Sequence, residues 1–134
     1  MPLVTFYFQM HQPFRLHPDR DLFFWEERNR DVFLKVAAKC YLPAVRMFTE
    51  LIAEYPLFKI ALGLSGTFLE QAELYTHEVV KALQELFAAG REGRQVECLD
   101  ETYYHSLTSL FADPRRQEFR DQVSMHRDKL KMLF

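Results

Sequence analysis

Three short runs of apolar and β-favouring residues along the chain each predict a strand. The first run, residues 3–10, is almost continuously apolar and ends at His11, as is typical of a strand buried on both faces of a parallel sheet. The second run covers residues 57–64 and the third covers residues 95–99. Residues 14–28 show no clear period, and the prolines and aspartates that flank or lie within them indicate a long structured loop.

Between the first two strands, apolar residues recur at the i, i+3, i+4 spacing of an amphipathic helix. Pro43 interrupts this pattern. Proline is unfavourable inside a helix, because it lacks an amide hydrogen and clashes with the preceding turn, but it fits the first helical position. The sequence therefore predicts two helices, residues 29–40 and 43–54, that meet at a bend.

A third amphipathic helix is predicted after the second strand. Thr67 and Glu70 have the spacing of a capping box at its start, and Gly90 is placed to end it. A last helix is predicted from about Pro114 to Lys131. The resulting order, β-α-α-β-α-β-α, predicts an α/β fold with a parallel sheet, because each crossover carries a helix.

Composition and charge restrict the class of protein. The chain has 134 residues and a net charge of −2, which is enough for one domain, residues 1–134, and gives no basic surface for nucleic acid. No apolar run is long enough to cross a membrane, and the N-terminus lacks the features of a signal peptide. Cys40 and Cys98 lie in apolar stretches, which predicts buried thiols in a reducing, cytoplasmic compartment.

Polar residues follow each predicted strand, and in a parallel sheet these three ends share one edge. His11 and Gln12 follow the first strand, residues 65–67 the second, and residues 100–105 the third. The aromatic content of 15% adds side chains on which a sugar ring stacks. The sequence thus predicts a polar and aromatic cleft that binds a hydroxylated ligand.

Structural interpretations of the same residues remain open. His11 and Gln12 also fit a turn at the end of a strand, and residues 65–67 fit a helix cap. Glu97 lies in an apolar strand, where it is either functional or on an exposed face. Tyr104 and His105 also fit ordinary interior packing. No metal-ligand spacing and no glycine-rich phosphate loop is present, so no metal or other cofactor is predicted.

Several stretches resemble glycoside hydrolase family 57, the amylase and 4-α-glucanotransferase family. The first contains the strand-end motif His-Gln-Pro, and the later ones resemble the α-amylase branch. In chain order these stretches are residues 4–16, 39–44, 65–71 and 96–107. The resemblance implies the N-terminal β-α-β-α-β-α portion of an incomplete TIM-like (β/α)7 barrel that acts on α-glucans with retention of configuration.

The resemblance also implies roles for individual residues. His11 matches the histidine that contacts the sugar next to the cleaved bond, with Gln12 beside it in the same motif. Glu97 matches the glutamate of the second conserved stretch, and Tyr104 and His105 fall in that stretch. The family's nucleophilic glutamate and acid/base aspartate come later than residue 134, so no catalytic residue is predicted in this chain.

The main hypothesis is the N-terminal part of an α-amylase-like enzyme, inactive alone, with an α-glucan or maltooligosaccharide as substrate. One alternative is a carbohydrate-binding or assembly module that is not catalytic and is completed by a partner chain. A weaker alternative is a metal-dependent, deacetylase-like barrel containing zinc. In either of the first two cases, strands 95–99 and 3–10 would have open edges, which predicts self-association.

Overall fold

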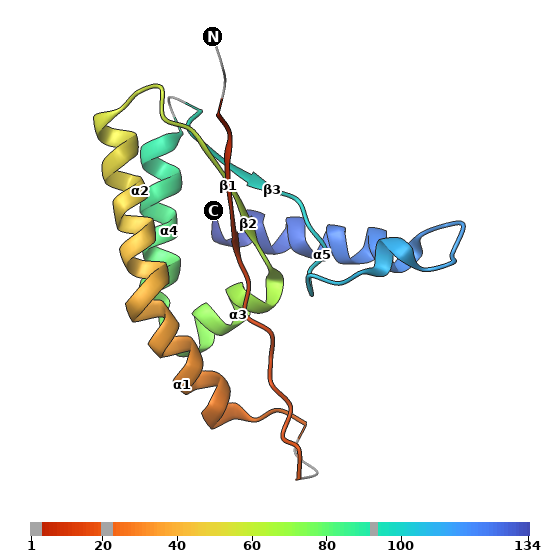
Figure 1. The fold of residues 1–134 in the computed structure, drawn as a ribbon. Helices are drawn as coiled ribbons and strands as arrows, with labels where there is room; N and C mark the ends of the chain where they lie inside the picture. Colours follow the sequence, from red (N-terminus) through yellow and green to blue (C-terminus); the bar gives the residue numbers. More distant parts are fainter. Residues whose placement is uncertain (1–3, 20–22, 92–93) are drawn as a thin grey trace.

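The computed structural model describes residues 4–19, 23–91 and 94–134. Its centre is a parallel sheet of β1 (Phe6–Met10), β2 (Ile60–Leu64) and β3 (Val96–Leu99), in the order β1-β2-β3 (Figure 1). Met10 pairs with Leu64, and Gly63 pairs with Leu99. The predicted parallel sheet is confirmed; Leu3 of the first predicted strand lies outside the described residues.

One continuous helical segment connects β1 to β2. It consists of α1 (Glu26–Val36), a π-helical turn η1 (Ala37–Tyr41) and α2 (Leu42–Glu54). The amide of Leu42 donates to the carbonyl of Ala37, five residues earlier, which is the π-helical spacing. The two predicted helices therefore meet end to end, and the segment begins three residues before the predicted start.

The single helix predicted after β2 is instead two helices, α3 (Gly66–Tyr75) and α4 (His77–Gly90). They are separated by Thr76, whose φ of −160° is extended. The cap also differs from the prediction, since Ser65 is the N-cap of α3 and its hydroxyl accepts from the amide of Phe68. Glu70, predicted to close a capping box, contacts another part of the chain.

After β3, a short 3₁₀ turn η2 (Thr108–Leu110) precedes the last helix, α5 (Gln117–Leu133). This helix begins three residues after the predicted start. It contacts α4, where the side-chain amide of Gln84 donates to the carbonyl of Leu133 at 2.8 Å, and it contacts α3 through the ion pair of Lys129 with Glu73.

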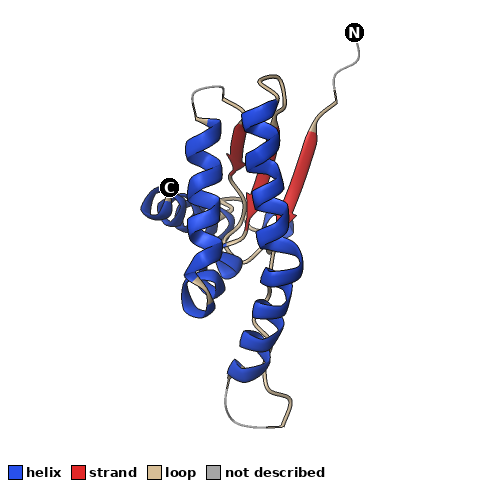
Figure 2. Ribbon diagram, turned by 90° about the vertical axis from the view of Figure 1, so that its left-hand side faces the viewer, coloured by secondary structure: helices blue, strands red, loops and turns tan. Residues whose placement is uncertain are grey.

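Helices α2 and α4 lie side by side over one face of the sheet (Figure 2). Phe8, Leu62 and Cys98 are paired across the three strands, and all three pack against the core beneath these helices. The opposite face carries the row of Tyr7, Ala61 and Glu97, one register step away. The hydrophobic core therefore fills the layer between the sheet and the two helices.

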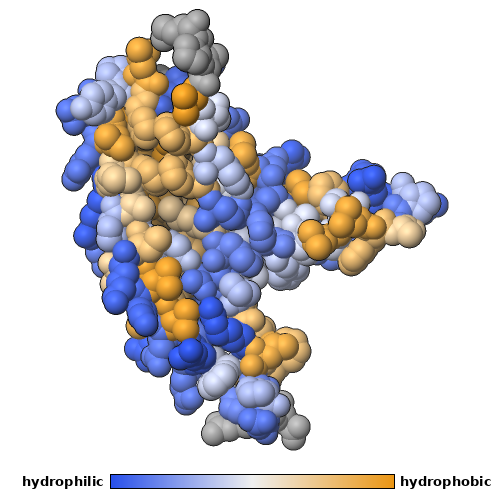
Figure 3. Space-filling model, in the orientation of Figure 1, coloured by the Kyte–Doolittle hydropathy of each residue, from blue (hydrophilic) through white to orange (hydrophobic). Residues whose placement is uncertain are grey.

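Two burial predictions are wrong. The first strand is not buried on both faces, because Phe6 is 46% exposed and Tyr7 is 52% exposed. Apolar side chains gather on the surface where β1 lies beside α2 (Figure 3). Cys40 is exposed rather than buried, whereas Cys98 is half-buried and its burial raises the pKa of the thiol to about 12.

Among the described strands, β1 and β3 are the two edges of the sheet. Hydrogen-bonding groups on the outer side of each edge strand therefore lack a strand partner in this part of the chain. No helix in the described ranges has both the length and the apolarity that a membrane crossing requires.

Candidate functional site

Side chains that follow each of the three strands meet at the carboxyl edge of the sheet, around His11. The Nδ1 atom of His11 lies 2.8 Å from the Oγ atom of Ser65, the residue that follows β2. Its ring lies against the ring of His105, with the two centroids 4.6 Å apart. Ser65 also caps α3, so the hydroxyl that fixes His11 is itself fixed by the start of a helix.

Glu101 connects the third strand to this cluster. Both of its carboxylate oxygens accept from the Nε2 atom of Gln9 at 3.0 Å, and one of them lies 2.9 Å from the Nδ1 atom of His105. The carboxylate therefore orients the His105 ring toward His11. Glu101 is in the predicted strand-end cluster of residues 100–105, but it is not one of the predicted substrate-binding residues.

His126, on α5, contacts the backbone amide of Glu101. It is fully buried, and its Nε2 atom lies 2.8 Å from the carbonyl of Leu64, which can only accept. The Nε2 atom must therefore carry the proton, which leaves Nδ1 to accept from the amide of Glu101 at 3.4 Å. The His126 side chain thus connects the end of β2 to the segment after β3.

The backbone at His105 has a left-handed conformation, with φ of 53°. Its amide donates to the carbonyl of Thr102 at 2.8 Å, which closes a tight turn. The left-handed conformation is uncommon for residues other than glycine, and it persists where the surrounding structure imposes it. Here the contacts of the side chain with Glu101 and His11 accompany the turn.

Burial and the neighbouring His105 lower the pKa of His11, and the Glu101 carboxylate partly opposes this effect. The folded state therefore favours the neutral form of the His11 ring near neutral pH. A neutral ring with one donor and one acceptor nitrogen is suited to binding hydroxyl groups.

The other predicted site residues lie in different places. Gln12 is buried: its backbone carbonyl accepts from the Nε2 atom of Gln71 at 2.8 Å, and its side-chain Oε1 accepts from the Arg15 guanidinium at 3.3 Å. Glu97 pairs across the sheet with Ala61, which in turn pairs with Tyr7. Tyr7, on β1, lies four residues before His11, so Glu97 is set back from the carboxyl edge. It lines a separate hollow beside α4 and α5, and the structure does not bring it to the histidines.

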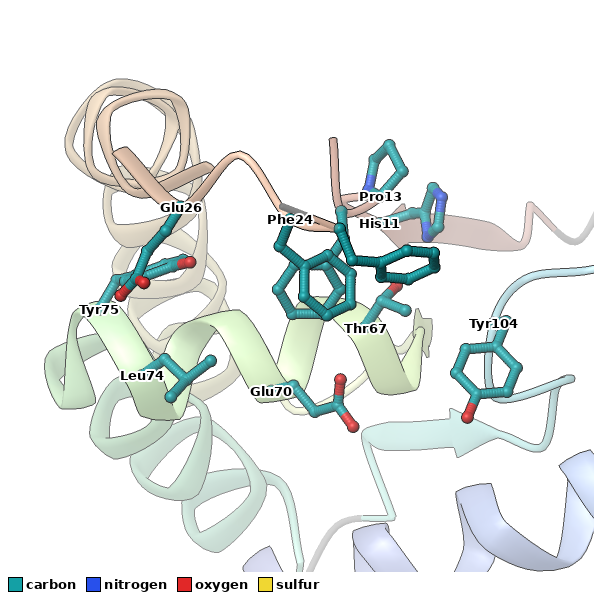
Figure 4. A pocket seen from close by; sticks show the side chains of 11 residues that line it. His11, Pro13, Phe24, Glu26, Thr67, Glu70, Leu74, Tyr75 and Tyr104 are labelled. Atoms are coloured by element: carbon teal, nitrogen blue, oxygen red, sulfur yellow. The ribbon is translucent and has the colours of Figure 1, made fainter. Parts of the chain in front are cut away.

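A cleft of about 830 Å³ opens beside His11 (Figure 4). Its polar lining includes His11, Thr67 and Glu70, and the exposed Tyr104 stands at one side. Its apolar lining comes mainly from the loop before α1 and from the later part of α3. The apolar side chains that line it are Pro13, Phe14, Phe23, Phe24 and Leu74.

This volume lies within the range of about 300–1,000 Å³ that small-molecule sites occupy. The cleft combines aromatic surface with a few polar groups. Within the described ranges, no three His, Cys, Asp or Glu side chains are arranged to hold a metal ion.

Comparisons with known proteins agree with this architecture. The model of glycosyl hydrolase family 57 matches residues 5–134. A Methanocaldococcus jannaschii protein named "Putative alpha-amylase" is 39% identical over 140 residues, covering 98% of this chain and 28% of the relative. The chain thus spans less than a third of that relative.

A solved structure, the 4-alpha-glucanotransferase of Thermococcus litoralis, superposes with a TM-score of 0.64 over 96% of this chain and 17% of that protein. The sequence identity is 23%, so the likeness concerns the fold. It supports the α/β prediction, with parallel strands and alternating helices arranged as the first part of a TIM-like barrel.

Proposed function

The chain belongs to glycosyl hydrolase family 57, and from this we propose that it forms the N-terminal, sugar-binding part of a retaining α-glucan hydrolase or glucanotransferase. The observation that carries the proposal is the histidine pair at the strand ends, held by Ser65 and Glu101 beside an aromatic cleft. The names of the two relatives support an α-glucan, or its maltooligosaccharide fragments, as the ligand.

Each predicted binding residue has a role in this proposal. His11 and His105 donate to and accept from sugar hydroxyls through the nitrogens that Ser65 and Glu101 leave unoccupied. Tyr104 offers an exposed ring at the side of the cleft. Gln12 acts through the backbone that carries His11, and Glu97 contacts a more distant part of the ligand.

We further propose that this chain alone has no catalytic residue. Hydrolysis with retention needs a nucleophile and an acid/base carboxyl about 5–5.5 Å apart. Glu101 is a poor nucleophile, because Gln9 and His105 already engage its oxygens. The chain therefore contributes binding residues, without a metal or other cofactor, and the carboxylate pair belongs to a later part of the polypeptide.

Titration calorimetry with maltoheptaose tests the binding proposal. We expect the chain to bind this sugar and His105→Ala to weaken binding about tenfold, the effect of losing a hydrogen-bonding group at a polar site. His77→Ala is the control, because His77 is exposed on α4 and does not line the cleft. Failure of the unaltered chain to bind would contradict the proposal.

An assay on starch tests the absence of catalysis. We expect no release of reducing sugar and no glucan transfer. Turnover that is lost in Glu101→Gln or Glu97→Gln would contradict the proposal, since it would assign a reacting carboxylate to this chain.

The open edges of the sheet favour a second candidate, a binding or assembly module that is completed by a partner chain. Such a module would bind sugar without turnover even when the family's later carboxylates are present in the same protein. Activity of a longer polypeptide that contains this segment separates the two candidates.

A further inference from the structure

The face of the sheet opposite to α2 and α4 carries a polar contact that reaches from the first strand to the end of the third. Gln9 on β1, Gly63 on β2 and Leu99 on β3 are paired across this face. The Nε2 atom of Gln9 donates to Glu101, which follows the third strand, at 3.0 Å. The Gln9 side chain therefore crosses the middle strand at Gly63.

Gly63 provides the space for this crossing. A Cβ at position 63 would come closer than 3.0 Å to the Oε1 atom of Gln9 and to the hydroxyl oxygen of Tyr7. Glycine weakens the interior of a strand, and it often marks a place where another group approaches the backbone closely. Both of the approaching atoms are the ends of flexible side chains, so alanine at this position would displace them from the sheet.

The two partners of the Gln9 amide determine its orientation. An ionised carboxylate only accepts hydrogen bonds, so the Nε2 atom of Gln9 faces Glu101 and its Oε1 atom faces the hydroxyl of Tyr7. The Tyr7 hydroxyl must then donate to Gln9. Burial and the Glu101 carboxylate raise the pKa of this hydroxyl, which keeps it protonated for that role. The Gln9 amide is thus fixed at both its nitrogen and its oxygen.

Glu101 needs this contact because its carboxylate is almost removed from water. Its side chain is only 13% exposed. In the described part of the chain, its hydrogen-bond donors are the amide of Gln9 and the ring of His105. A carboxylate at such a site is costly without donors. Loss of the Gln9 amide would therefore favour a turn of the carboxylate toward solvent, and the His105 ring would lose its fixed partner.

We propose that Gln9 is a positioning residue of the histidine pair. It fixes the Glu101 carboxylate from the opposite edge of the sheet, and this carboxylate holds the His105 ring in the pair. Gly63 leaves room for the Gln9 side chain, and Tyr7 fixes its oxygen. The inference rests on the proposed function only in its effect on binding, because the position of the ring is measured without a sugar.

Proton NMR of the intact chain measures the positioning directly. The ring centroids of His11 and His105 are 4.6 Å apart, which is close enough for a nuclear Overhauser contact between their ring protons. We expect this ring contact in the unaltered chain and its loss in Gln9→Met, which keeps the length of the side chain but has no donor. Gln84→Met is the matched control and keeps the ring contact, because the Gln84 amide donates at an exposed position on α4.

Exchanging the two groups separates positioning from a general loss of structure. Gln9→Glu places two carboxylates together and should abolish the ring contact. When Gln9→Glu is combined with Glu101→Gln, the hydrogen bond is reversed, since the amide at position 101 donates to the carboxylate at position 9 and still accepts from His105. We expect this exchanged variant to recover the ring contact.

Gly63→Ala tests the crossing over the middle strand. It should remove the ring contact by displacing the Gln9 side chain. It should cause no further loss in a chain that already carries Gln9→Met, because the two substitutions interrupt the same interaction.

Titration calorimetry with maltoheptaose relates the positioning to binding. Gln9→Met should weaken binding about fivefold, less than His105→Ala, because the ring is still present but is no longer held. The exchanged variant should restore the affinity, and Gln84→Met should leave it unchanged.

The outcomes distinguish this inference from the proposed function. If Gln9→Met and Gly63→Ala keep the ring contact and the affinity of the unaltered chain, the positioning role is overturned and the proposed function stands. If the unaltered chain binds no sugar but its ring contact depends on Gln9 and returns in the exchanged variant, the proposed function is overturned and the positioning role stands. Should Gln9→Met fail to fold, the exchanged variant decides, and its failure to recover the ring contact would overturn the role.

Discussion

At the scale of single residues, the protonation of His11 links the site to stability. Burial and His105 lower its pKa, so the folded chain binds a proton less readily than the unfolded chain. Stability is therefore complete above the ordinary histidine pKa and is lost as pH falls below it. We expect the urea midpoint to fall between pH 7.5 and pH 5.5, less steeply in His11→Gln.

The exposed His77 supplies the control for this prediction, because it lies on the surface of α4. His77→Gln should keep the pH dependence of the unaltered chain. A pH profile that is the same for His11→Gln and for the unaltered chain would contradict the account.

Gln71 is the residue that fixes the backbone beside His11. It is fully buried, and its Nε2 atom donates to the carbonyls of Gln12 and Thr67. Its Oε1 atom is buried without a hydrogen-bond partner in the described part of the chain. Gln71→Met removes that unfavourable oxygen but leaves two carbonyls with fewer donors, so we expect a net loss of about 1 kcal/mol in the free energy of unfolding.

Urea unfolding measures this loss, and Gln84→Met is the matched control. The Gln84 amide also donates to a carbonyl, that of Leu133, but at an exposed position. Its substitution should change stability by less than about 0.5 kcal/mol. Equal losses in the two variants would show that burial of the Gln71 amide is not the cause.

At the scale of elements, Ser65 joins the end of β2 to the start of α3. Its hydroxyl caps the helix through the Phe68 amide and also contacts His11. Ser65→Ala should therefore lower the free energy of unfolding by about 1–2 kcal/mol. Thr76→Ala should cost less, because Thr76 precedes α4 without a side-chain cap; chemical denaturation of both variants checks the order.

The elements differ in how far they follow from sequence. The second and third strands are local apolar runs, and the periodicity of the helices is also local, so these were predictable. The division at Thr76 and the shift of the cap from Thr67 to Ser65 depend on how the chain packs. Local patterns do not contain that information.

Some contacts of the site could likewise be predicted from the sequence, and others could not. The strand-end rule brings His11 and His105 together as expected. The support from Glu101 depends on Gln9, 92 positions earlier in the chain, and the support of Glu70 depends on Tyr103. Such contacts between distant residues follow from the packed fold, and the sequence pattern does not predict them.

At the scale of the whole molecule, the two sheet edges govern association. Phe6 on β1 is 46% exposed, and edge strands of this kind pair with other chains. We expect light scattering to give a mass above 16.0 kDa that rises with concentration, and Phe6→Lys to lower it. Leu107→Lys, at an exposed position outside the sheet, is the control.

A sharp monomer of 16.0 kDa at all concentrations would contradict this prediction. It would mean that the outer sides of β1 and β3 are protected from pairing in solution.

The π-helical turn η1 accommodates one more residue than a regular α-helix would between Phe33 and Tyr41. An α-helix advances about 100° per residue, so Phe33 and Tyr41, eight positions apart, would face directions about 80° apart. With one residue absorbed by η1 they share a face, and both rings lie within 6 Å of the Phe68 ring. Lys39, exposed within η1, is thus equivalent to an inserted residue.

The effect of removing the extra residue depends on Pro43. In a regular helix its ring would clash with the carbonyl of Lys39, four residues earlier, at a cost of about 3 kcal/mol. Deleting Lys39 alone should therefore destabilise the chain, and deleting it together with Pro43→Ala should restore cooperative thermal unfolding. The extra residue and the proline are then a matched pair, which lineages of this segment would gain or lose together.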